Sequence, residues 1–104
     1  MGNDRLRAAS GETDVAEETL REIISGVGLD PQDGFIRDSL GDALDDALRA
    51  LPAAPRTVVE AQVFDGLTFR ELAEATGESI DTLMARKRYA LRNLSRALRH
   101  WIEE

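Results

Sequence analysis

The sequence of 104 residues contains no cysteine and only five aromatic residues. Without cysteine the chain has no disulfide bond, no thiolate metal ligand and no cysteine nucleophile. No apolar run approaches the roughly 18 residues of a membrane-spanning helix, and the N-terminus lacks the charged-then-apolar pattern of a signal peptide. We therefore expect a cytoplasmic protein with no membrane partner.

The residues that are abundant are Ala, Leu, Arg, Glu and Asp. Straight-chain residues of this kind favour helices, whereas strands are enriched in β-branched and aromatic residues. The hydrophobic fraction of 42% is sufficient for one compact core at this length. The composition predicts an all-α fold.

The net charge of −7 alone argues against a nucleic-acid partner, but the charges are unevenly distributed. Residues 1–54 hold 12 acids and 5 bases, whereas residues 55–104 hold 8 of each. Between Thr82 and His100 there are six basic residues and no acid: Arg86, Lys87, Arg88, Arg92, Arg96 and Arg99. On a helix the last four form one stripe, which favours a polyanionic partner. The alternative is a solvated face whose arginine stems cover apolar surface.

The N-terminal half divides into three segments. Residues 1–12 are polar and aperiodic, and we expect a disordered tail there. Thr13 or Asp14 is positioned to cap an acidic helix that ends near Ser25, with Gly26 directly after it. The residues from Gly28 to Gly34 are rich in turn formers and predict a linker. We assign residues 13–38 to this helix and linker, and residues 39–104 to the main domain.

Two further helices are expected next. The first begins at a Ser39 cap and ends at Leu51, because Pro52 follows. The second has Pro55 in its first turn and ends at Phe64. Its inward-facing residues are predicted to be Val58, Val59, Val63 and Phe64.

The last two helices have the spacing of a helix-turn-helix. Thr68 and Glu71 form a capping box at the start of a short helix that ends near Thr76. Ser79 caps the next helix only a few residues later, and that helix runs from Ile80 to about Ile102. Its predicted inner face consists of Ile80, Leu83, Met84, Ala90, Leu91, Leu94, Leu98 and Trp101. We therefore expect a helix-turn-helix without a wing, preceded by an extra N-terminal helix.

The segment from Asp42 to Leu98 resembles region 4 of sigma-70-type RNA polymerase sigma factors, especially the extracytoplasmic-function group. The resemblance lies in Ala47–Pro52, Arg56–Val59 and Phe64–Glu74, followed by Gly77, Ser79, Thr82, Leu83, Arg86, Ala90 and Leu94. It implies a transcription module that binds the −35 promoter element and docks on the β flap of RNA polymerase. By position, the DNA-binding candidates are Thr68, Arg70, Thr82, Arg86, Lys87, Arg88 and Arg92. The candidates for contact with polymerase or another protein are Leu44, Leu48, Leu51, Val59 and Val63.

The sequence also departs from the family pattern. Met84 replaces a usual basic residue, Lys87 a usual aliphatic one and Tyr89 a usual arginine. Asp81 and Glu78 place two acids where the second helix would enter the major groove. Carboxylates suit the positive end of a helix, but they repel phosphate.

Two other functions stay open beside promoter binding. One is a sigma-like protein-interaction module, such as an adaptor or the target of an anti-sigma factor. The other is a stand-alone regulator that dimerises through the N-terminal helix or the Trp101 end. The N-terminal helix either folds back over the helices Leu40–Leu51 and Pro55–Phe64 or pairs with another copy.

No catalytic motif, metal-ligand spacing or cofactor-binding loop is present in the sequence, so we expect no enzyme, metal or cofactor. His100 is the only histidine and has no other ligand type at metal-binding spacing. Trp101 is interpreted as a core plug or helix-end anchor.

Overall fold

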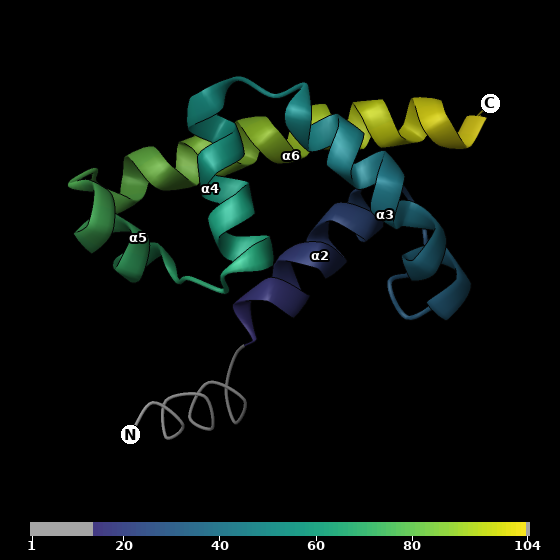
Figure 1. Ribbon diagram of the computed structural model, residues 1–104, viewed down its shortest axis with the longest axis horizontal. Helices are drawn as coiled ribbons and strands as arrows, with labels where there is room; N and C mark the ends of the chain where they lie inside the picture. The colour runs from purple at the N-terminus through teal and green to yellow at the C-terminus, as the bar shows by residue number, and fades with distance from the viewer. Residues whose placement is uncertain (1–13, 104) are drawn as a thin grey trace.

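The computed structural model describes residues 14–103 and contains no strand in that range. The all-α prediction is confirmed, and Figure 1 shows the long C-terminal helix running along the whole molecule. The predicted tail and Thr13 lie outside the described residues. None of the described helices is long and apolar enough to cross a membrane. The helices are α2 (Val15–Gly26), α3 (Gly34–Arg49), α4 (Ala53–Phe64), α5 (Phe69–Thr76) and α6 (Ile80–Glu103).

Two of the predicted helix starts are capped as the sequence indicates. The Asp14 carboxylate accepts a hydrogen bond from the Glu17 backbone N–H at 3.1 Å, which fixes the start of α2. At α5 the Glu71 N–H donates to the Thr68 hydroxyl at 3.1 Å, and the Thr68 N–H donates to Glu71 Oε1 at 2.8 Å. This reciprocal pair satisfies two backbone donors that the helix itself leaves unpaired.

The predicted start of α3 at Ser39 is wrong. The helix begins at Gly34, because the Asp33 carboxylate accepts from the backbone N–H groups of Phe35 and Ile36 at 2.9 and 3.4 Å. Asp33 thus caps the helix inside the segment that was predicted to be a linker. The following helix, α4, begins at Ala53, so Pro55 lies in its first turn as predicted.

The end of α2 also differs from the prediction. Gly26 is the last helical residue, and Gly28 takes the left-handed conformation with φ of 85°. The Leu29 N–H then donates to the Ile24 carbonyl at 3.2 Å, as expected after a left-handed C-terminal residue. Gly26 has a different role, because a Cβ atom there would lie 2.6 Å from Ser95 Oγ. The absent side chain lets the end of α2 approach α6 closely.

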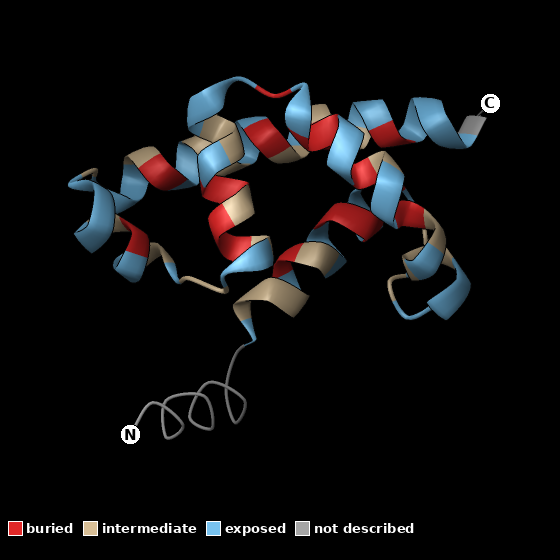
Figure 2. Cartoon of the chain, viewed as in Figure 1, coloured by how far each residue is buried: buried red, intermediate tan, exposed pale blue. Residues whose placement is uncertain are grey.

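The main core lies where α2, α3, α4 and α6 meet (Figure 2). Its centre contains Ile24 from α2, Val59 from α4 and Leu94 from α6, all with no exposed surface. A smaller cluster joins the helix-turn-helix to α4 through Leu72, Leu83, Val58 and Ala61. The other buried residues of the main core are Ile23, Val27, Leu40, Leu44, Ala47, Leu48, Leu51, Ala90 and Leu98.

Several residues predicted to face inward are instead exposed. Phe64 is 60% exposed, and Ile80 and Met84 are 42% and 40% exposed. Phe64 is the last residue of α4, and Ile80 and Met84 lie in the first two turns of α6, which the eight-residue α5 leaves partly uncovered. Trp101 is 41% exposed on the last turn of α6, so it does not plug the core.

The acidic helix α2 is folded back onto the domain, and its principal neighbours are α4 and α6. Besides its apolar side chains, α2 is held by an ion pair between Glu17 and Arg37 of α3. Glu17 also pairs with Arg21 of α2 itself at 3.0 Å. The hydrogen bonds from Arg37 and then Arg21 lower the pKa of the Glu17 carboxyl below its usual value of 4.5. The helix is therefore attached by both burial and charge.

Ile24→Ala should destabilise the domain by about 2 to 5 kcal/mol, because it leaves a cavity at a site with no exposed surface. Urea unfolding followed by circular dichroism measures this change. Ile102→Ala is the matched control, since Ile102 is 39% exposed and should cost less than about 1 kcal/mol. Equal losses of unfolding free energy in the two variants would contradict the packing of α2 into the core.

Glu17→Gln should lower stability at neutral pH and have little effect in acid. A carboxyl whose pKa is lowered in the folded state stabilises the fold above its unfolded pKa, and this contribution is lost as the pH falls through the folded value. Thermal melts at about pH 7 and about pH 3 should therefore show a difference from the wild type only at the higher pH. Glu18→Gln, one residue along the same helix, is the control. A pH-independent difference for Glu17→Gln would exclude the ion pair as its cause.

Candidate nucleic-acid interface

The helix-turn-helix is formed by α5, a three-residue turn and the first half of α6. Gly77 ends α5 in the left-handed conformation, with φ of 78°, which favours glycine. Ser79 then accepts from the Thr82 N–H at 3.1 Å and so caps α6. Leu72 and Leu83, which are 3% and 1% exposed, pack in one cluster and fix α5 against α6.

The outward face of this unit is basic. Arg88 and Arg92 are exposed one turn apart on α6, and Arg70 is exposed on α5. None of the three has an acidic partner among residues 14–103. Their guanidinium groups are thus available to an anion from solution.

The two other basic candidates already have acidic partners within the fold. Arg86 Nη1 lies 3.4 Å from Glu78 Oε2. Lys87 Nζ lies 3.0 Å from Glu22 Oε1 of α2 and 5.3 Å from the centroid of the Phe69 ring. The Lys87 side chain is only 14% exposed. Of the basic candidates on α6, Arg86 and Lys87 are therefore paired with acids, whereas Arg88 and Arg92 are not.

The two threonine candidates are both engaged in helix caps. The Thr68 hydroxyl accepts from the Glu71 N–H and donates to Glu71 Oε1 at 3.3 Å. The Thr82 hydroxyl accepts from Ser79 Oγ at 3.0 Å. Thr68 is exposed and Thr82 half-buried, so a phosphate would meet hydroxyl groups already oriented by their helices.

The residues predicted to bind polymerase or another protein lie within the core. Leu44, Leu48, Leu51 and Val59 are buried, and Val63 is half-buried and packed against the same cluster. In this conformation they contact other helices of the domain rather than the solvent.

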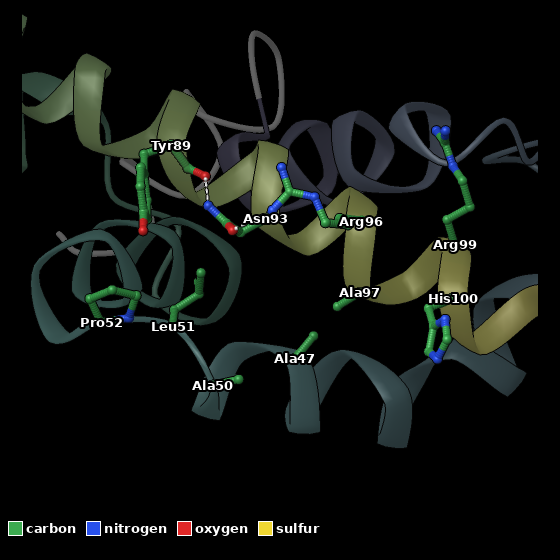
Figure 3. Close-up of a pocket in the computed structure, with 10 residues that line it drawn as sticks. All are labelled: Ala47, Ala50, Leu51, Pro52, Tyr89, Asn93, Arg96, Ala97, Arg99 and His100. Carbon is green, nitrogen blue, oxygen red and sulfur yellow. Dashed lines mark hydrogen bonds between the residues drawn. The ribbon is translucent and has the colours of Figure 1, made fainter.

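A groove that the sequence did not indicate lies next to this core (Figure 3). It has a volume of about 830 Å³ and runs between α6 and the end of α3. In Figure 3, Tyr89 points toward Pro52, and His100 points toward α3. The remaining lining residues are Ala47, Ala50, Leu51, Asn93, Arg96, Ala97 and Arg99.

The groove continues along α6 toward the helix-turn-helix. A second hollow of about 460 Å³ shares Pro52 and Tyr89 with the first and is also lined by Pro55, Thr82, Ala85 and Arg86. The lining is mostly apolar and the charges along it are arginines, with no acidic residue. In the sequence, the departure from the family pattern at Tyr89 was the one sign of this surface.

The described residues contain no group of His, Cys, Asp or Glu side chains arranged to hold a metal ion. The arrangement that is present consists of a short capped helix, a tight turn and a long helix with exposed arginines. These features define a helix-turn-helix domain of the DNA-binding class.

Comparison with known proteins gives the family. Residues 41–100, more than half of the chain, match the family model described as Sigma-70, region 4, and the chain belongs to this family. It is thus a sigma-factor-type DNA-binding domain of transcription, in a family of non-catalytic domains that work with RNA polymerase. No curated protein and no solved structure gives a significant match. The match includes most of α3 and all of α4 and α5, but α2 lies before it.

Proposed function

We propose that this domain binds a −35-type promoter element, with the first half of α6 in the major groove and α5 crossing the backbone. The observation that carries the proposal is the exposed pair Arg88 and Arg92 on the second helix of the helix-turn-helix, without acidic partners among residues 14–103. Arginine is suited to this role because its planar fork binds guanine edges and phosphates through two hydrogen bonds.

The positions of the other charges assign different roles to the two arginines. Asp81 and Glu78 stand at the start of α6, where their carboxylates repel phosphate. Arg88 is the nearer of the two to this end, and we assign it to base edges. Arg92 lies one turn farther along α6, and we assign it, with Arg70 of α5, to the phosphate backbone.

Replacing both Arg88 and Arg92 with Ala should weaken DNA binding about 10- to 100-fold. It should also reduce the slope of log affinity against log salt concentration by about 1, because the phosphate contact assigned to Arg92 is lost. Fluorescence anisotropy with promoter DNA, titrated at several salt concentrations, measures both quantities. The double substitution Arg49→Ala/Arg56→Ala is the control, since it removes the same charge from α3 and α4. DNA affinity that falls equally in both variants would exclude α6 as the DNA-binding helix.

A second part of the proposed function is docking on RNA polymerase through the groove beside α6. The residues that the sequence suggested for this contact are buried, whereas the groove offers exposed apolar surface next to them. The positively charged Arg96 lines the same groove, so its occupant should combine apolar side chains with a carboxylate. We assign it to the β flap of the polymerase.

Filling the groove with Ala97→Phe should weaken binding to a β-flap fragment at least tenfold, because the ring occupies space that the partner needs. DNA binding should be unchanged, since Arg88 and Arg92 are left intact. Isothermal titration calorimetry with the flap fragment measures the effect. Ala75→Phe is the control, because Ala75 is exposed on α5 and lines neither hollow. Undiminished flap binding by Ala97→Phe would place the polymerase contact elsewhere.

A further inference from the structure

The acidic edge of α2 lies against the helix-turn-helix. Glu22 Oε1 of α2 is 3.0 Å from Lys87 Nζ, and the lysine is enclosed between this carboxylate and the Phe69 ring. Exposed surface ion pairs contribute little, but here the Lys87 side chain is only 14% exposed. One cation of the DNA-binding helix is therefore neutralised within the chain.

The same acidic edge also borders other DNA-binding candidates. A hollow of about 230 Å³ is lined by Glu18, Glu22, Thr68 and Lys87 among others. A neighbouring hollow of about 200 Å³ is lined by Glu22, Lys87 and Arg88 among others. A phosphate backbone that contacts the N-terminus of α5 and Arg88 must therefore pass beside these two carboxylates. Carboxylates and phosphates that pass close to each other repel, and the repulsion weakens as the salt concentration rises.

The carboxylates are held there by contacts that do not involve them. Ile23 and Ile24 anchor α2 in the core, and the Arg99 guanidinium donates to the Gly26 carbonyl at 3.1 Å. Because α2 is fixed at these points, the backbone positions of Glu18 and Glu22 stay beside the helix-turn-helix. The helix also lies outside the segment that matches the sigma region 4 family.

We propose that α2 is an autoinhibitory element, in which Glu22 and Glu18 compete with DNA phosphates for Lys87, Arg88 and the start of α5. The inference rests on the proposed DNA binding. The proposal predicts that this chain binds DNA more weakly than the same fold would with an uncharged α2.

Glu22→Gln tests the proposal, because it keeps the shape of the side chain and removes its charge. Affinity for double-stranded DNA should rise about three- to tenfold, and the salt slope should steepen by about 0.9 as Lys87 gains a phosphate. Glu18→Gln should give a smaller increase. Asp45→Asn is the matched control, since it makes the same charge change at an exposed position on α3, away from α5 (Figure 1). Thermal melts show whether each variant is folded.

The outcomes separate this inference from the proposed function. If the wild type binds DNA and Glu22→Gln binds no better than Asp45→Asn, α2 is a structural helix only and the inference fails. If a purely structural role holds, Glu22→Gln changes the melting temperature and not the DNA affinity. If no folded variant binds DNA, including Glu22→Gln, the proposed function itself fails and the autoinhibition with it.

Discussion

The structure depends on the inner row of apolar side chains along α6, formed by Leu83, Ala90, Leu94 and Leu98. Each is at most 1% exposed. The last three meet α2, α3 and α4 in the main core, whereas Leu83 meets α4 and α5 in the smaller cluster. Because α6 is unbroken over its 24 residues, the two clusters hold fixed positions relative to each other. The packing of α2, α3 and α4 against α6 therefore orients the helix-turn-helix.

The sequence was most informative where the signal is local. The capping box of Thr68 and Glu71 involves residues three positions apart, so it was readable without any tertiary contact. The Asp33 cap was equally local, but it lies among turn-forming residues that suggested a loop. Met84 was misassigned for another reason. Periodicity gives the apolar stripe of a helix, but only the neighbouring helices determine how much of that stripe they cover.

Predicting the candidate site required more than the pattern of charges. The spacing of Arg88 and Arg92 correctly indicated an exposed stripe, because residues four apart share a helix face. The partner of Lys87 could not be predicted, since Glu22 lies on a helix far earlier in the chain. The sequence also indicated little of the groove beyond Leu51 and Tyr89, which both line it. Its walls combine the end of α3 and the residues after it with α6 from Tyr89 to His100, two segments that lie far apart in the sequence.

The three faces of α6 explain how one helix can serve several contacts. The inner row of apolar side chains is buried in the core. Arg88 and Arg92 are exposed to solvent on a second face, and Tyr89, Asn93 and Ala97 line the groove on a third. A ligand on the arginine face and one in the groove therefore touch different side chains along the same helix. Since the groove extends to Thr82 and Arg86, the two surfaces come closest near the start of α6. Both ligands fit at once only if the groove's occupant ends before that point.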